Sequence, residues 1–191
     1  MCHYITATMG PNGDESIVRR LAKASLLKWE PLDNQGVIDQ LRSGERYFRT
    51  ARGSCDCGTE IGAAIRTESS PLSDLDLSRQ IKKRKKQGWS DGKVDDWVEQ
   101  TVAEAVRKQK ETAARLAGPH YEVNHWIQFV SAVLMGNHAD WIGIMLHWYR
   151  GNIATEALAV HNRRCLTLAD FTAEYLLHAE EDVLHTVKLH S

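Results

Sequence analysis

The stretch Trp141-Ile142-Gly143-Ile144-Met145-Leu146-His147-Trp148-Tyr149 carries the clearest β-strand pattern in the chain. Alternate residues point to opposite faces of a strand, and here both sets are largely apolar. Two apolar faces are typical of a strand at the centre of a sheet that is covered on both sides. We therefore expect the fold to be organised around this strand, with a turn at Arg150-Gly151-Asn152 and a hairpin partner over residues 155–162.

Two more segments are rich in β-branched and aromatic residues and indicate strands. Residues 2–9 form one of them, with Cys2, Tyr4, Thr6 and Thr8 on the same face. Residues 45–51 form the other and lead into a stretch that contains two cysteines. Together these segments predict a small, mostly antiparallel sheet of about four strands.

Apolar residues at helical spacing predict five or six helices packed on this sheet. The longest is expected near 91–117, because Ser90 can cap its start and Gly118-Pro119 can end it. Asp14 can cap an earlier helix, and a further helix is expected over residues 122–136. The prediction is a single α+β domain over residues 1–191, with a possible helical insertion at about 67–118.

A last helix is predicted to start at Thr167 or Asp170 and to extend past Val183. His178, Glu181 and His185 would share one side of it, because they are spaced i, i+3 and i+7. This set has the residue types of a metal site, but an exposed polar face explains the spacing as well and is the favoured interpretation.

The stretch 53–58, Gly-Ser-Cys-Asp-Cys-Gly, holds two of the four cysteines. In a strand, Cys55 and Cys57 would face one site together, and Cys2 could join them if the two segments meet. Three thiolates and one imidazole are a common structural zinc set. His3 is the nearest imidazole in sequence but would point away from Cys2 in a regular strand, so His120, His125 or another histidine could serve instead. The other interpretation is that these are small buried thiols beside a glycine turn, so the expected cofactor is none or, alternatively, zinc.

The opening Met1-Cys2 resembles that of class II glutamine amidotransferases, which implies an alternative in which Cys2 is a catalytic nucleophile. Removal of Met1 would leave an α-amino group that acts as the base. The similarity stops at His3, where those enzymes carry glycine, and the helix-rich second half does not suit their layered sheets.

Six cations lie between Arg79 and Lys86 and would suit phosphates or an acidic partner protein. No aromatic residue interleaves with them, and the net charge of the whole chain is −1. Carboxylates flank the run at Asp74, Asp76, Asp91, Asp95 and Asp96. These features favour a solvated helix surface over a nucleic-acid site.

Two pairs of side chains complete the candidates. His147 and His161 would approach each other across the predicted hairpin and are interpreted as satisfied core or rim histidines. Trp29 and Trp89 lie near predicted helix ends, where they could serve a binding surface.

Several segments together resemble a group of small uncharacterised bacterial proteins. The similar segments are Cys2-His3-Tyr4-Ile5-Thr6, Gly44-Glu45-Arg46-Tyr47-Phe48, Cys55-Asp56-Cys57-Gly58-Thr59, Leu146-His147-Trp148-Tyr149 and Glu181-Asp182-Val183-Leu184. The resemblance implies a bacterial cytosolic protein and brings no activity or catalytic residues.

The sequence contains no secretion signal, no apolar run near the ~18 residues of a membrane span, and no phosphate-binding or nucleophile motif. We therefore expect a cytoplasmic protein with reduced cysteines and no membrane partner. The leading hypothesis is a binding protein rather than an enzyme, an immunity protein or antitoxin that occludes a partner toxin. The alternative is a zinc-binding or cysteine-dependent enzyme built on Cys2, Cys55 and Cys57.

Overall fold

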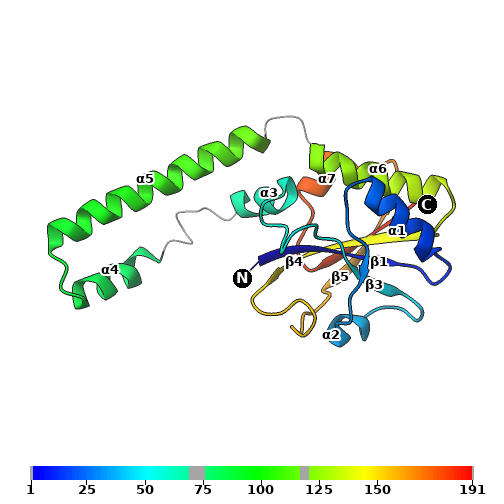
Figure 1. The fold of residues 1–191 in the computed structure, drawn as a ribbon, viewed down its shortest axis with the longest axis horizontal. Helices are drawn as coiled ribbons and strands as arrows, with labels where there is room; N and C mark the ends of the chain where they lie inside the picture. Colours follow the sequence, from blue (N-terminus) through cyan, green and yellow to red (C-terminus); the bar gives the residue numbers. More distant parts are fainter. Residues whose placement is uncertain (1, 69–75, 117–120, 191) are drawn as a thin grey trace. The chain divides into compact units, whose positions relative to one another are not determined.

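The computed structural model of the chain describes residues 2–68, 76–116 and 121–190. Within them the fold is α+β, with a mixed sheet of six strands and with seven helices. The α+β class is confirmed, whereas the predicted numbers of strands and helices were too small. The chain forms two compact units, one of Met1–Gly62 with His120–Ser191 and one of Ala63–Pro119. The sheet belongs to the first unit (Figure 1).

Two long strands form the centre of the sheet and pair over their full length. β1 (Cys2–Met9) and β4 (Trp141–Tyr149) run antiparallel, with Cys2 opposite Tyr149. Apolar residues from both strands share one face and are at most 2% exposed: Ile5, Ala7, Met9, Ile142, Ile144 and Leu146. The prediction of a central strand at 141–149 is confirmed.

The other strands extend the sheet in the order β2-β3-β1-β4-β6-β5. On one side, β3 (Arg46–Arg49) pairs with the second half of β1, and β2 (Glu30–Pro31) pairs with β3. On the other side, β6 (Val183–Lys188) pairs antiparallel with β4, and β5 (Asn162–Thr167) pairs with β6 in parallel. The first half of β1 is therefore left without a neighbouring strand on the β3 side.

Two predictions for the C-terminal part were wrong. Residues 155–161 are a loop, and the strand that follows them pairs with β6 rather than with β4. The predicted last helix shrinks to α7 (Ala173–Leu177), which Thr172 caps, and Val183 begins a strand. Five of the six β6 residues are buried, so both faces of the strand are covered and its sequence lacks the alternation that separates a strand from a helix.

Helices α1 (Glu15–Ala24) and α6 (Tyr121–Met135) lie over one face of the sheet (Figure 1). Asp14 caps α1 as predicted, because its carboxylate accepts the Ile17 N–H at 3.1 Å. Under these helices Trp29 is 2% exposed, and its ring centroid lies 4.5 Å from that of Phe48. Trp29 is therefore a core residue, and its predicted role in a binding surface was wrong.

The opposite face of the sheet has a smaller core. It is covered by α2 (Gln35–Ile38) and by the segment 150–161. Its buried members are Leu32, Val37, Tyr47, Met145, Tyr149, Leu158 and Leu184. Covering from both sides explains why β4 has apolar residues on both faces.

The second unit is almost entirely helical. It contains α4 (Leu77–Lys86), α5 (Asp91–Leu116) and most of α3 (Glu60–Glu68). The predicted long helix is confirmed, and the Lys93 N–H points to the Ser90 hydroxyl at 3.4 Å. No described helix combines the length and the apolar composition that crossing a membrane requires.

Candidate metal centre

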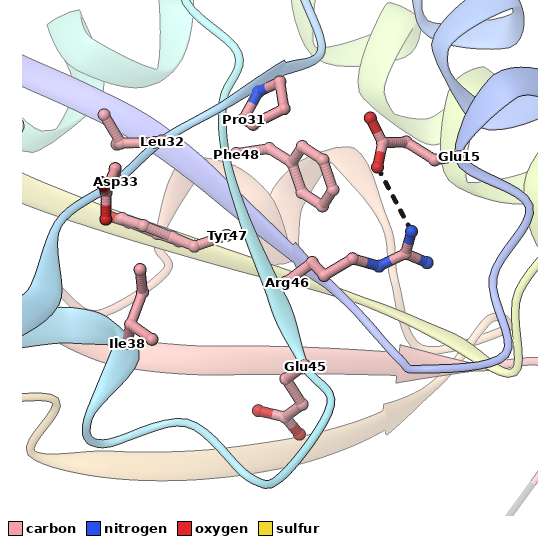
Figure 2. Close-up of a pocket in the computed structure, with 9 residues that line it drawn as sticks. All are labelled: Glu15, Pro31, Leu32, Asp33, Ile38, Glu45, Arg46, Tyr47 and Phe48. Carbon is pink, nitrogen blue, oxygen red and sulfur yellow. Dashed lines mark hydrogen bonds and ion pairs between the residues drawn. The ribbon is translucent and has the colours of Figure 1, made fainter.

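An open pocket of about 270 Å³ lies beside β2 and β3 (Figure 2). Its main charged groups are already paired, because Arg46 contacts Glu15 at 3.2 Å and Glu45 contacts Arg163 at 2.6 Å. None of its nine lining residues is a cysteine or a histidine. Shape alone therefore does not mark this pocket as a reactive site.

The cysteine-bearing loop lies against the first half of β1, where β3 no longer pairs. The Asp56 N–H donates to the His3 carbonyl at 2.9 Å, and the Asp56 carboxylate accepts the Ile5 N–H at 2.8 Å. The Thr50 hydroxyl also donates to the Ile5 carbonyl, at 2.5 Å. The loop thus satisfies the edge of β1 that β3 leaves open. Cys55 and Cys57 lie in this loop and not in a strand as predicted.

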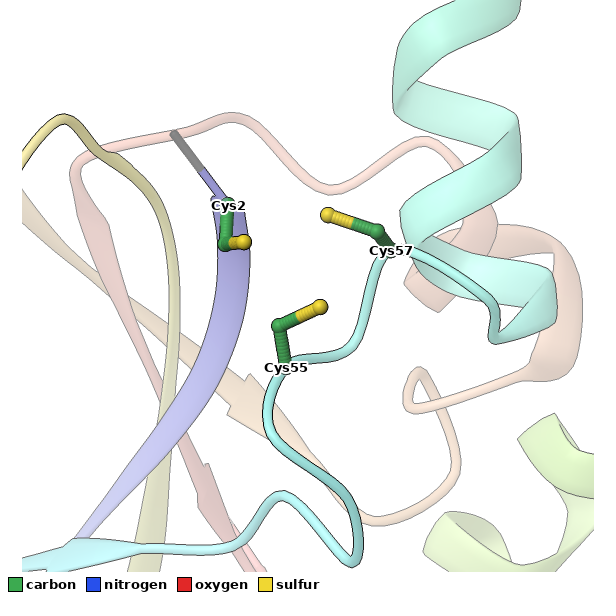
Figure 3. Close-up of side chains that lie close together, drawn as sticks. All are labelled: Cys2, Cys55 and Cys57. Atoms are coloured by element: carbon green, nitrogen blue, oxygen red, sulfur yellow. The ribbon is translucent and has the colours of Figure 1, made fainter.

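This contact brings three thiols together (Figure 3). The Sγ atoms of Cys2, Cys55 and Cys57 all lie within 4.8 Å of one another, and all three residues are half-buried. Zinc–sulfur bonds of about 2.3 Å place tetrahedral thiolates about 3.8 Å apart, so a small inward shift would seat an ion. The fourth cysteine, Cys165, is exposed on β5 and lies outside the group.

Backbone N–H groups point at two of the sulfurs. The His3 N–H donates to Cys57 Sγ at 3.1 Å. A hydrogen bond from the Cys57 N–H is the main cause that lowers the pKa of Cys55. The pKa of Cys2 is raised, chiefly because its thiol hydrogen-bonds to Cys55, and burial adds to the effect. Cys55 is therefore the first of this pair to become a thiolate, which is the form that binds metals.

The loop is also fixed from its far end, where α3 begins. The Glu60 carboxylate accepts the N–H groups of Glu122 and Val123 at 3.1 and 3.0 Å, at the start of α6. In return, the Glu122 carboxylate accepts the Glu60 N–H at 2.8 Å. Each carboxylate thus caps the other helix and accepts hydrogen bonds from N–H groups that have no partner within that helix. No local pattern in the sequence signals this exchange, because the two residues are 62 positions apart.

Residues 53–62, with their contacts to β1 and to the start of α6, are called the cysteine corner, and close backbone packing also stabilises it. A Cβ atom at Gly62 would lie 2.2 Å from the Asp56 carbonyl oxygen, so only glycine lets α3 approach the loop this closely. Asp56 itself is 5% exposed, and burial raises the pKa of its carboxyl to about 6. The hydrogen bond from Ile5 and the charge of Arg49 oppose that rise. Asp56 was missed as a site residue, although it stands between the two cysteines.

Of the imidazoles proposed as a fourth ligand, the two that the structure describes, His3 and His125, do not join the thiols. His3 Nε2 lies 2.6 Å from Glu181 Oε1, and its ring packs edge-on against Trp148 at 4.2 Å. His125 lies on α6, outside the ligand group, and His120 falls outside the described residues. Among the residues that the structure places, the group therefore supplies three protein ligands.

The histidine set predicted on a last helix was wrong, because no helix carries it. His178 ends α7, Glu181 pairs with His3, and His185 lies in β6. His185 is 1% exposed, with its two ring nitrogens on the Tyr175 hydroxyl and the Glu180 carbonyl at 2.7 and 3.1 Å. Burial lowers its pKa, so the ring stays neutral and structural.

His147 and His161 meet the same residue rather than each other. His147 Nδ1 hydrogen-bonds to the Asp182 carboxylate, and the His161 N–H donates to the Asp182 carbonyl at 2.8 Å. The other ring nitrogen of His147, Nε2, lies 3.9 Å from Glu156 and is inaccessible to solvent. A nitrogen that is closed off in this way has no access to a substrate, so we assign His147 a structural role.

Comparison of the chain with protein-family models, with curated proteins and with solved structures finds no match. Any function assigned to the chain therefore depends on the geometry of the three-cysteine group.

Proposed function

We propose that the protein binds zinc through Cys2, Cys55 and Cys57. The observation that carries the proposal is the convergence of three Sγ atoms within 4.8 Å from two segments more than fifty residues apart. Thiolate sulfur is a preferred ligand of zinc, and two backbone N–H groups aimed at these sulfurs support their negative charge.

Three protein ligands leave the fourth position of a tetrahedral zinc to water or to a substrate. Closed structural sites use four protein ligands, whereas catalytic sites use three. The ligand count of the described residues thus favours a zinc with an exchangeable position. The loop that carries two ligands is held by β1 and by the start of α6, so the three thiols are already close together before the metal arrives.

Elemental analysis and chelator competition test the proposal on the reduced, purified chain. We expect one zinc per chain, and cobalt in its place should show sulfur-to-metal charge transfer. Loss of a residue that only orients a metal ligand typically weakens metal binding by about 10- to 100-fold. Cys55→Ser removes a ligand itself, so it should weaken zinc binding by more than this. Cys165→Ser is the matched control, because this exposed thiol lies outside the group, and it should leave the affinity unchanged. Full zinc binding by Cys55→Ser would overturn the proposal.

Cysteine nucleophilic catalysis is the other chemistry open to this group. The Cys2 alternative requires removal of Met1, because the base would be the α-amino group that this removal frees on Cys2 itself. The raised pKa of Cys2 disfavours it as a nucleophile relative to Cys55. Occlusion of a toxin stays a prediction from the sequence, since no described contact specifies such a partner.

A further inference from the structure

Helix α4 has two unlike faces. Leu77, Ile81 and Arg84 are half-buried on the side that packs against α5, and the Arg84 guanidinium lies 3.9 Å from the ring centroid of Trp97. The other side carries four exposed cations at positions i, i+3, i+4 and i+7: Arg79, Lys82, Lys83 and Lys86. These four residues are called the basic stripe, and they form one continuous face over two helical turns.

Two of the carboxylates that flank the basic stripe in sequence are engaged elsewhere, and Asp74 falls outside the described residues. Asp76 caps α4 by accepting the Arg79 N–H at 3.0 Å, and Asp91 pairs with Lys85 at 2.8 Å. Asp95 and Asp96 lie on α5. In the part of the chain that the structure describes, no ion pair joins the stripe to a carboxylate. The described flanking carboxylates therefore do not form the ion pairs that would neutralise these four cations.

Helix α5 shows how a solvated helix face is balanced in the same unit. Its Arg107 contacts Glu104 at 2.7 Å and Glu111 at 2.5 Å, at i, i+3 and i+4 spacing. In α4 the same spacings join like charges, which destabilises a helix. The helix dipole favours the cations of the last turn but not Arg79 or Lys82.

The stripe lies in the unit of the chain that carries a net positive charge. Residues 63–119 contain twelve Lys and Arg against nine Asp and Glu, a net charge of +3. The remainder of the chain contains twelve against sixteen, a net charge of −4. A charge asymmetry of this kind between parts of one chain is typical of proteins that bind a polyanion.

We propose that the basic stripe of α4 binds the phosphate backbone of a nucleic-acid duplex, without reading its sequence. A protein partner would need apolar or aromatic anchors, and the stripe has none. A membrane would need an exposed apolar face, but the apolar side of α4 packs on α5. A single strand would need aromatic rings on which its bases can stack. The nearby Trp89 ring is already covered by Arg84 and Lys93, at 4.5 and 4.4 Å from its centroid, so a duplex fits the stripe better.

Fluorescence anisotropy with two labelled DNA duplexes of unrelated sequence tests this assignment on the full chain. If all four cations contact phosphates, the slope of log K against log salt should be about −3.6, from about −0.9 per contact. Removing two of them with Lys82→Gln and Lys83→Gln should weaken binding to both duplexes equally and flatten the slope by about 1.8. Circular dichroism of this double variant checks that the helices remain folded.

The matched control removes two cations from α5, with Arg107→Gln and Lys108→Gln. Both side chains are paired with carboxylates, so the slope should not change. The assignment fails if the native chain does not bind either duplex at low salt, or if the α4 and α5 variants lose affinity equally. It also fails if polyglutamate displaces the duplex as well as unlabelled DNA does, because the stripe would then fit an acidic protein.

Discussion

In the cysteine corner, the hydrogen bonds that hold the loop to β1 and to α6 join residues 45 to 63 positions apart, whereas side-chain hydrogen bonds in α5 join residues three or four apart. The corner buries the charged groups Asp56 and Glu60, which are 5% and 6% exposed. In α4 and α5, Val94 is the one described residue that is fully buried. A substitution in the corner therefore disturbs a buried backbone contact, whereas one in the helix pair changes mainly local helix stability.

The largest expected effect is the pH response of the corner. The folded protein holds the Asp56 carboxyl at a pKa of about 6, above the usual 3.8, so it binds more protons than the unfolded chain between these values. The free energy of unfolding should therefore fall by roughly 3 kcal/mol as the pH rises from about 4 to about 6, and then level off.

Hydrogen exchange of the β1 and β4 amides in the metal-free protein, at a series of pH values, measures this loss. Asp56→Asn keeps an oxygen for the Ile5 N–H but does not titrate, so its profile should lack the fall. Asp96→Asn, on the exposed surface of α5, is the control and should behave like the native chain. If the free energy of unfolding falls equally with pH in the Asp56 and Asp96 variants, the fall does not come from the Asp56 carboxyl.

Two glycines give effects of opposite sign. Gly62→Ala places a Cβ atom 2.2 Å from the Asp56 carbonyl oxygen, and overpacking of this kind destabilises by about 1–3 kcal/mol. Gly92→Ala lies in α5, where a Cβ atom meets nothing within 4 Å, so it should stabilise that helix by about 0.4–1 kcal/mol. Protection of the β1 amides from hydrogen exchange measures the first change in stability, and protection of the α5 amides measures the second. If both variants were destabilised, or both stabilised, the two regions would not differ in the way described.

The smallest effect is expected on the outer face of α5. Arg107→Ala removes pairs with Glu104 and Glu111, each worth about 0.2–0.5 kcal/mol. The loss should be confined to α5 amides and should disappear at about 1 M salt, where charges are screened beyond about 3 Å. A loss that persists at high salt, or that reaches β1, would show that α5 is coupled to the corner.

Much of the candidate site could be predicted, since the sequence indicated Cys2, Cys55 and Cys57 as one possible group. The predicted local structure was wrong, because Cys55 and Cys57 lie in a loop that completes the edge of β1 and not in a second strand. Asp56 was visible between the cysteines, but its burial depends on the contact with β1. The exchange of caps between Glu60 and Glu122 leaves no trace in either segment alone.

The sequence by itself determined the elements whose signals are local: β1, β4, the capped helices α1 and α5, and the basic run of α4. Helical periods, caps and alternation act over a few residues, so they can be read directly from the chain. Only the tertiary structure decided the six-strand order, the parallel pairing of β5 with β6 and the strand that begins at Val183. It also decided the meeting of the three thiols, because that depends on contacts between residues far apart in sequence, which no local pattern specifies.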